Sequence, residues 1–300
     1  MIPVNSVLQV GFFPEIMQLE IDRRLVPISM LDPKGPVPDR NVKAILTRPS
    51  FAINPTLLDQ LPEIKMIACC GVGYDNLPLD YLKQRGIIAS NTPGVLNDAV
   101  CELTIGLLFG LLRKIPEAHQ FVLQKTWAAE TFPFTTSGMG RIGQELAARL
   151  LPFKVEIAYH GPSSKSLPYV FFPSLMDLAR ESDVLILTCP GGKATEKIIN
   201  TSILNALGPK GYLINVARGS VVNEDDLISA LQNKVIAGAA LDVFENEPNP
   251  KPAFLSLSNV LLAPHIGSAT QETRQAMTNL AIDNLEAFFN HQSLPTPISI

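Results

Sequence analysis

The stretch GMGRIGQELAARL at residues 138–150 decides the fold. Three glycines in it have the spacing G-x-G-x-x-G, and a helix-like segment follows them at once. Such glycines allow a tight turn and a close approach of the backbone to a pyrophosphate, and the helix N-terminus provides unpaired N–H groups. The strand-like VEIAY at residues 155–159 completes a β-α-β unit. We therefore predict a dinucleotide site that contains Gly138, Gly140, Arg141, Ile142 and Gly143.

The segment immediately before the glycines is unusual for this fold. A dinucleotide-binding motif normally follows a strand of apolar, β-branched residues, but residues 131–137 read TFPFTTS. Pro133 cannot donate a hydrogen bond to a central strand ladder. Either this segment serves as the first strand, or the first strand is missing.

Short β-branched runs alternate with longer helix-like segments on both sides of this motif. Such alternation is typical of parallel β-α-β units, so we expect an α/β fold with two sheets and a division of the chain near Leu96. The expected strands are residues 7–11, 44–47, 66–69, 87–90, 155–159, 169–172, 184–188, 211–215 and 260–263. The expected helices are residues 55–61, 79–85, 98–113, 142–151, 175–181, 200–207, 223–232 and 271–290.

Composition excludes several classes of protein. The chain has 300 residues, of which 46% are hydrophobic and 17% are charged, against about 25% charged in an average globular chain. We therefore expect a large buried core. The net charge of −4, without a block of like charges, argues against a nucleic-acid or anionic-membrane partner.

Targeting and cysteine patterns indicate a cytoplasmic protein without a metal site. The first residues, MIPV, show no signal-peptide pattern, and the longest apolar stretch, residues 103–112, is half a membrane span. The cysteines have no C-x-x-C spacing, so we expect buried thiols in a reducing compartment. These cysteines are Cys69, Cys70, Cys101 and Cys189.

The segment YHGPSSK at residues 159–165 bears on the choice of dinucleotide. An acidic residue here would bind the ribose hydroxyls of NAD, but none is present. Ser163, Ser164 and Lys165 instead suit the 2′-phosphate of NADP by hydrogen bonding and charge. The alternative is a polar turn without a ligand. We predict NADP, with NAD as the second choice.

Three further side chains follow predicted strands and suit catalysis together. Arg218 can bind a carboxylate through two parallel hydrogen bonds. A glutamate such as Glu247 beside His265 favours a protonated imidazole, which can donate a proton to a carbonyl oxygen as a hydride arrives. Each residue taken singly also fits an ordinary structural role. Their shared position at strand ends favours an active site.

Six motifs carry a resemblance to a known family. They are GVGYD at 71–75, NTPGVL at 91–96, GRIG at 140–143, NVARGSVV at 215–222, LDVFENEP at 241–248 and PHIGS at 264–268. In order and spacing, the chain resembles the D-isomer-specific 2-hydroxyacid dehydrogenases. Within that family it is most similar to the glyoxylate, hydroxypyruvate and hydroxyphenylpyruvate reductases. The resemblance covers nearly the whole chain.

The resemblance implies two Rossmann-like lobes with the active site in the cleft between them, and a homodimer. Residues 1–96 and 272–300 would form the substrate lobe, and residues 97–271 the dinucleotide-binding lobe. The expected activity is reduction of small 2-oxo acids to D-2-hydroxy acids with NAD(P)H. The implied substrate-site residues are Arg218 with the backbone N–H groups of Val72 and Gly73 on the carboxylate, His265 as the acid/base, and Glu247 as its partner.

The resemblance also implies roles at the cofactor. Asp242 would hold the nicotinamide carboxamide, and Val216 and Cys189 would line the cofactor cleft. NADP-preferring relatives carry an arginine where this chain has Pro162, so one 2′-phosphate ligand of those relatives is absent here.

One departure from the family is large. Relatives have about ten more residues, including the first Rossmann strand, between a segment like residues 132–137 and the glycines. The first strand of the cofactor lobe is therefore expected to be deleted, with residues 130–136 drawn into or beside the gap. A non-catalytic or deletion-impaired dinucleotide-binding homologue is accordingly the rival to the enzyme.

Overall fold

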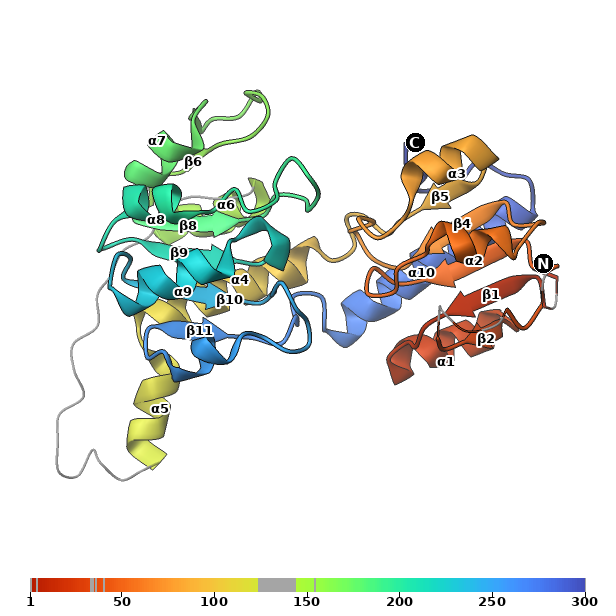
Figure 1. Cartoon of the computed structure of the whole chain (residues 1–300), viewed down its shortest axis with the longest axis horizontal. Helices are drawn as coiled ribbons and strands as arrows, with labels where there is room; N and C mark the ends of the chain where they lie inside the picture. The colour runs from red at the N-terminus through yellow and green to blue at the C-terminus, as the bar shows by residue number, and fades with distance from the viewer. Residues whose placement is uncertain are drawn as a thin grey trace. The chain divides into compact units, whose positions relative to one another are not determined.

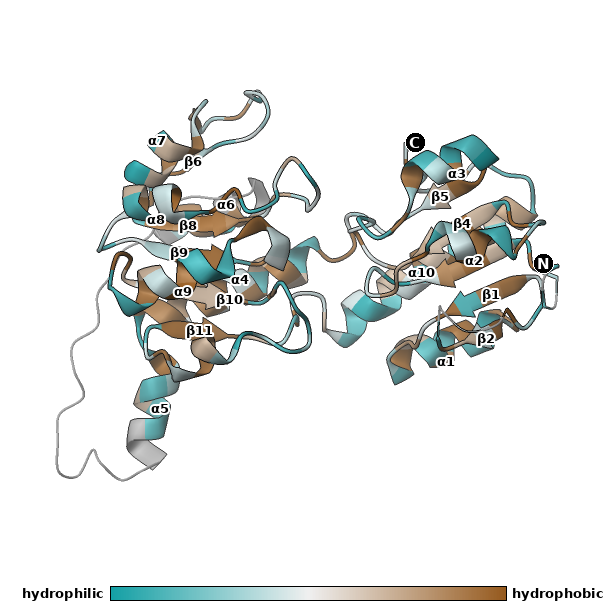
Figure 2. Ribbon diagram, in the orientation of Figure 1, coloured by the Kyte–Doolittle hydropathy of each residue, from teal (hydrophilic) through white to brown (hydrophobic). Residues whose placement is uncertain are grey.

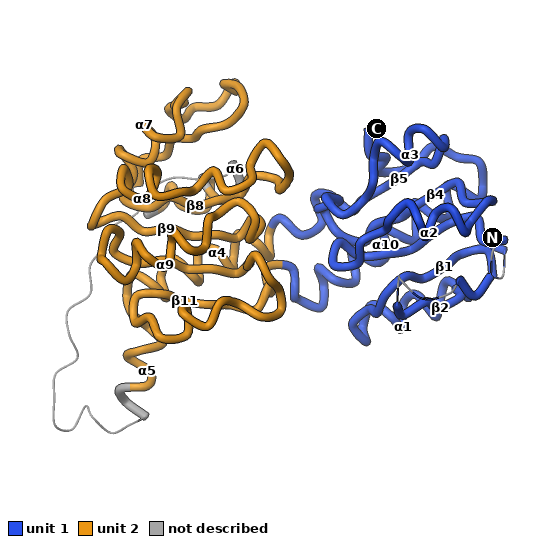
Figure 3. The backbone as a smooth tube through the Cα atoms, in the orientation of Figure 1, with its two compact units in different colours: residues 1–97, 268–300 blue, residues 98–267 orange. Residues whose placement is uncertain are grey.

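The computed structural model describes residues 2–3, 5–32, 35, 37–39, 41–123, 144–153 and 155–299. The chain forms two compact units, which are unit 1, residues 1–97 with 268–300, and unit 2, residues 98–267 (Figure 3). Both units combine helices with parallel strands, so the predicted α/β class is confirmed. The glycine motif and the segment before it lie outside the described residues.

Unit 1 contains one five-stranded parallel sheet with the order β2-β1-β3-β4-β5 (Figure 1). In this sheet β1 pairs with β3, although β2 lies between them in the sequence. The strands are β1 (Val7–Val10), β2 (Ile28–Met30), β3 (Ala44–Thr47), β4 (Met66–Cys69) and β5 (Ile88–Ser90).

Helices cover both faces of this sheet because alternate strand residues point in opposite directions. Leu8, Ile45 and Ile67 pack on one face with α2 (Pro55–Asp59) and α3 (Leu79–Arg85). Val7, Ala44 and Met66 pack on the other face with α1 (Glu15–Arg24) and α10 (Gln271–Phe289). The last long helix of the chain thus completes the core of its first unit.

The described strands of unit 2 form two separate parallel sheets (Figure 1). A four-stranded sheet has the order β11-β10-β9-β8, and β6 pairs with β7 apart from it. The strands are β6 (Ala158–Tyr159), β7 (Val170–Phe171), β8 (Val184–Leu187), β9 (Tyr212–Asn215), β10 (Gly238–Leu241) and β11 (Val260–Leu262).

The four-stranded sheet is also covered on both faces. Leu185 and Leu213 face a core with α7 (Leu175–Arg180), α8 (Thr201–Leu207) and α9 (Glu224–Gln232). Ile186 and Ile214 face α4 (Asn97–Leu112) and α6 (Gln144–Leu150). Another helix, α5 (Ile115–Leu123), follows α4. Figure 2 shows hydrophobic residues concentrated in the strands of both units, as expected for sheets buried on both faces.

Several elements differ from the sequence prediction. β2, β10, α1 and α5 were not expected, and the strands predicted at residues 155–159 and 169–172 are shorter. The sequence of β10 is GAAL, which lacks the β-branched residues that mark a strand. A Cβ atom on Gly238 would lie 2.9 Å from the carbonyl oxygen of Asn259, so close packing favours a small residue there. No helix in the described ranges is both long enough and apolar enough to cross a membrane.

Candidate active site

The predicted catalytic side chains follow the carboxyl ends of three neighbouring strands in unit 2. Arg218 comes after β9, Glu247 after β10 and His265 after β11. In an open parallel sheet, this is the edge at which ligands bind. The topology therefore explains why residues distant in sequence are brought to one edge.

His265 and Glu247 form a direct contact. The Nδ1 atom of His265 lies 2.6 Å from Oε2 of Glu247, and Oε1 of Glu247 accepts a hydrogen bond of 3.0 Å from the N–H of Phe244. Burial raises the pKa of the Glu247 carboxyl, but hydrogen bonds from His265 and Phe244 and the nearby charge of Arg218 outweigh it, so the net pKa is lowered. Glu247 is thus an ionised partner for the imidazole at neutral pH.

The turn that carries His265 is fixed by the buried Asp242. Its Oδ1 accepts a 2.8 Å hydrogen bond from Ile266 N–H and its Oδ2 a 2.9 Å bond from Gly267 N–H. Burial raises the pKa of Asp242 by more than these two hydrogen bonds lower it, so the net pKa is raised. His265 itself has φ 53°, a left-handed conformation that only a well-supported turn maintains for a non-glycine residue. The role of Asp242 toward the nicotinamide stays a prediction.

Arg218 lies in a turn held by the last residue of β9. The side-chain oxygen of Asn215 accepts from Ala217 N–H at 3.0 Å, and its amide donates to the carbonyl oxygen of Arg218 at 3.0 Å. The guanidinium of Arg218 is half-buried and donates to the carbonyl of Ala217 at 2.6 Å. Its charge also acts on Glu247, which places the two side chains in the same part of unit 2.

Gly219 locks this turn against the segment that carries Glu247. A Cβ atom at this position would lie 1.9 Å from the carbonyl carbon of Phe244 and 2.4 Å from the nitrogen of Glu245. No side chain fits such a distance. The two loops that hold Arg218 and Glu247 are therefore in backbone contact.

The predicted 2′-phosphate residues lie on an exposed loop after β6. The Tyr159 hydroxyl accepts from the N–H of Lys165 at 2.7 Å and donates to its carbonyl at 3.0 Å, which closes the loop. The side chains of Ser163, Ser164 and Lys165 are exposed and form no hydrogen bond or ion pair within the described part of the chain. They fit a phosphate ligand, because no other described residue uses their donors.

Two other predicted cofactor residues also follow strands of unit 2. Val216 comes directly after β9 and packs with the core that includes α4 and α6. Cys189 follows β8 and is half-buried, and burial raises the pKa of its thiol. The glycine-motif residues Gly138, Gly140, Arg141, Ile142 and Gly143 lie outside the described residues.

Val72 and Gly73 lie in unit 1, on the loop after β4. Val72 is 38% exposed, and its carbonyl accepts a 2.9 Å hydrogen bond from the side chain of Asn91. Because these residues belong to unit 1, their contact with the unit 2 residues stays a prediction.

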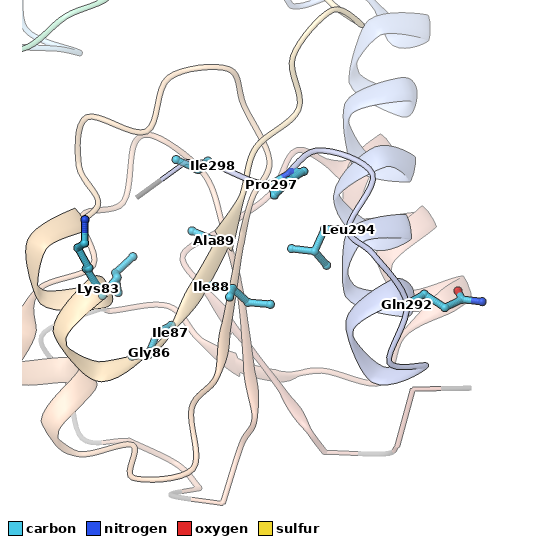
Figure 4. A pocket seen from close by; sticks show the side chains of 10 residues that line it. Lys83, Gly86, Ile87, Ile88, Ala89, Gln292, Leu294, Pro297 and Ile298 are labelled. Atoms are coloured by element: carbon cyan, nitrogen blue, oxygen red, sulfur yellow. The ribbon is translucent and has the colours of Figure 1, made fainter.

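A pocket of about 490 Å³ in unit 1 contains none of these residues. It lies between α3, β5 and the C-terminal tail, where Ile88, Leu294 and Pro297 supply an apolar lining (Figure 4). Lys83 and Gln292 are its polar side chains. It offers no acid/base pair for catalysis.

Three residues that support the site, Asn215, Gly219 and Glu224, were not among those predicted from the sequence. Asn215 and Gly219 are part of the NVARGSVV motif, so their proximity to Arg218 was a usable signal. Glu224 follows this motif as an acidic residue at a helix start, where a surface position is the ordinary expectation. It is instead 2% exposed.

Parallel sheets with an acid/base pair beyond the strand ends fit an α/β enzyme, and comparison with known proteins specifies both its class, an NAD(P)-dependent oxidoreductase, and its family. The model for "D-isomer specific 2-hydroxyacid dehydrogenase, NAD binding domain" matches residues 105–267. A glyoxylate/hydroxypyruvate reductase of Arabidopsis thaliana is 39% identical over 86% of both chains. A 2-ketogluconate reductase of Gluconobacter oxydans is 40% identical over 86% of both chains. The chain belongs to the D-isomer-specific 2-hydroxyacid dehydrogenase family, as its motifs predicted.

A solved structure shows the same architecture over almost the whole chain. The NADPH-dependent glyoxylate/hydroxypyruvate reductase of Sinorhizobium meliloti, in complex with NADP and malonate, is 38% identical, with a TM-score of 0.93. The match covers 99% of this chain and 97% of that one. The Rossmann-type fold class is therefore confirmed.

The alignment with the Arabidopsis relative also contains a length difference. It extends over 268 positions but covers 86% of this chain, and 86% of 300 residues is about 258. About ten aligned positions therefore have no residue in this chain.

Proposed function

We propose that this NAD(P)-dependent oxidoreductase reduces small 2-oxo acids, such as glyoxylate or hydroxypyruvate, to D-2-hydroxy acids with NADPH. The observation that carries this proposal is the 2.6 Å contact between Nδ1 of His265 and Oε2 of Glu247 at the strand ends. The glyoxylate/hydroxypyruvate reductases among the relatives support the substrate class.

Reduction requires a hydride at the carbonyl carbon and a proton at the carbonyl oxygen. A bound nicotinamide supplies the hydride. His265 supplies the proton, and because Glu247 engages Nδ1, the nitrogen left to donate is Nε2. The negative charge of Glu247 stabilises the protonated ring until transfer.

Arg218 holds the substrate in this proposal. Its guanidinium can donate two parallel hydrogen bonds to the carboxylate of the 2-oxo acid. The backbone N–H groups of Val72 and Gly73 add donors from the unit 1 loop. Unit 1 is thereby the substrate lobe and unit 2 the cofactor lobe.

NADP is the preferred cofactor. Ser163, Ser164 and Lys165 present unused donors and a positive charge after β6, and the segment contains no carboxylate that would repel a 2′-phosphate. The NADP-bound structure of the Sinorhizobium relative supports this choice. Asp242, Val216 and Cys189 would complete the nicotinamide side.

A cytoplasmic homodimer is the proposed working form. The resemblance to dimeric members of the family supports the dimer, and the four cysteines, all within the described residues, form no disulfide, which fits a reducing compartment. Light scattering on the purified protein tests the mass. A monomer that is fully active would contradict the proposed form.

The decisive test follows NADPH oxidation by absorbance after addition of glyoxylate or hydroxypyruvate. Oxidation that depends on the 2-oxo acid and is faster with NADPH than with NADH supports the proposal. Binding of NADPH without oxidation contradicts it and favours a second function.

That second function is a dinucleotide-binding homologue impaired in catalysis. One observation favours it: in the described residues, the β6–β7 pair is not joined to the β8–β11 sheet. The loop after β6 and the residues after β8 would then lack a common sheet to align them for NADP. Fluorescence titration with NADPH, without substrate, separates weak binding from lost chemistry.

A further inference from the structure

Glu224 is a buried acid beside the proposed catalytic pair. It is the first residue of α9, directly after the helix cap Asn223, and is only 2% exposed. Its Oε1 accepts a 2.8 Å hydrogen bond from the backbone N–H of Glu245, while Oε2 has no hydrogen-bond partner among the described residues. Burial of a carboxyl group costs free energy, so a protein retains one where its acceptor is needed.

The hydrogen bond from Glu245 reaches the segment that carries Glu247. The preceding residue, Phe244, donates its N–H to Oε1 of Glu247. Residues 244–247 therefore form a short turn in which the N–H of Phe244 donates to Glu247 and the N–H of Glu245 donates to Glu224.

Other contacts hold the same turn from different sides. The backbone at Gly219 lies against Phe244 and Glu245 too closely for any side chain. The carboxylate of Glu245 pairs with Lys197 at 3.2 Å and with Lys251 at 3.6 Å. These lysine contacts fix the side chain of Glu245, whereas its backbone N–H depends on Glu224.

We propose that Glu224 is a positioning residue for the reaction, and that it sets the Glu247 carboxylate against His265 through the Glu245 N–H. The N–H of Glu245 donates to Oε1 of Glu224, and the N–H of Phe244 in the same turn donates to Oε1 of Glu247. Oε2 is left to meet the imidazole at 2.6 Å. This inference rests on the proposed function of His265 as proton donor.

The acceptor oxygen, rather than the charge, is what the turn requires. Burial raises the pKa of Glu224, and the negative charges of Glu245 and Asp225 raise it further. The hydrogen bond from the Glu245 N–H and the positive charge of Lys251 lower this pKa, but the net pKa is raised. A neutral carboxyl still accepts a hydrogen bond through its carbonyl oxygen. Glutamine at this position retains such an oxygen at the same reach.

Two variants with a matched control test the proposal. Glu224→Gln retains the acceptor, whereas Glu224→Asp withdraws it by about 1.5 Å, one carbon–carbon bond, and so breaks a 2.8 Å contact. The control is Asp177→Asn, at an exposed acidic residue in the first turn of α7 that pairs with Arg180 at 2.7 Å and has no contact with the 244–247 turn.

The readouts are the pH dependence of kcat/KM with glyoxylate and NADPH, and hydrogen–deuterium exchange of residues 242–250. For Glu224→Asp we expect about a tenfold loss of kcat/KM, which is a fraction of the contribution of general acid catalysis. We also expect the alkaline limb of the pH profile of kcat/KM to move to lower pH, because Glu247 is less well placed beside His265. Exchange at the turn rises. Glu224→Gln and Asp177→Asn retain the wild-type pH dependence of kcat/KM and the wild-type exchange.

A lowered melting temperature of Glu224→Asp with an unmoved limb overturns the proposal, because a purely structural role predicts that pattern. If Glu224→Asp does not fold, Glu224→Gln decides, since a moved limb in that variant is equally contradictory. If the wild type reduces no 2-oxo acid, the proposed function fails. Exchange at residues 242–250 and the pH response of the His265 ring in NMR, one of four histidines, then test the positioning separately.

Discussion

The sheets of the two units differ in continuity. In unit 1, β1 to β5 pair without interruption, and each strand lies beside at least one partner in a single five-stranded sheet. In unit 2, the described strands divide into β8–β11 and the β6–β7 pair. β8 is nevertheless as buried as β3, since all four residues of each strand are buried. Helix packing can thus bury an apolar strand that the described ladder pairs on one side only.

This difference separates two properties of the proposed site. The proposed catalytic residues Arg218, Glu247 and His265 follow β9, β10 and β11, which belong to the continuous part of unit 2. The proposed 2′-phosphate residues follow β6, on the other side of the interruption. Catalytic chemistry and cofactor affinity are therefore expected to respond to different changes.

The largest expected effect is in the continuous part. His265→Ala removes the proton donor and should lower kcat with a 2-oxo acid by about 10²–10⁴-fold, the usual contribution of general acid catalysis. NADPH affinity, measured by fluorescence titration, should stay close to wild type. A variant with unchanged kcat would show that the proton comes from another group.

The next effect concerns the interruption itself. Insertion of SGKRVGIVG between Ser137 and Gly138 supplies an apolar strand and should raise both the melting temperature and the NADPH affinity. Each buried backbone group that gains a partner avoids a cost of about 1–3 kcal/mol. If the unmodified chain binds NADPH at micromolar concentrations and the insertion changes neither quantity, the proposed loss of a strand is wrong.

A moderate effect is expected from Glu247→Gln. The pKa of Glu247 is lowered in the folded protein, so its charge contributes stability above its unfolded pKa, and this contribution is lost as pH falls through the lowered value. Glutamine removes that dependence and the charge beside His265. The alkaline limb of the pH profile of kcat/KM should move to lower pH, because the carboxylate beside His265 is gone. An unmoved limb would exclude Glu247 as the partner.

The smallest effect is at the loop after β6. Lys165→Ala removes one exposed phosphate contact and should weaken NADPH by about fivefold, in line with the small energies of surface ion pairs. NADH, which has no 2′-phosphate, should bind unchanged. Ser166→Ala, at the next exposed position, is the matched control. Equal loss of both cofactors in Lys165→Ala would contradict the assignment.

The sequence predicted those elements whose local signals agree with the fold. β3 and β4 are short, mostly apolar runs that each follow a lysine, and α3 ends before Gly86, whose φ of 63° favours glycine. The structure has all three at the expected residues. β10 was missed because glycine and alanine carry no strand signal, and tertiary packing alone places them between two strands.

The site was predictable to the level of residue identity but not of contacts. The motifs supplied Arg218, Glu247 and His265, and the structure joins the last two. No sequence rule shows that Glu224 bonds the backbone of Glu245, 21 residues away, because such a contact depends on how two loops meet. The same holds for Gly219, whose need for glycine arises from Phe244 rather than from its own turn.

The position of α10 has a consequence for biosynthesis. This helix contributes Met277, Ala281, Ile282 and Leu285 to the unit 1 core, although unit 1 begins at the N-terminus. Unit 2 is therefore synthesised completely before unit 1 has its last helix, and one face of β1 to β5 is covered until then by α1 alone. A truncated chain that ends before residue 268 should expose the rest of that face to chaperones.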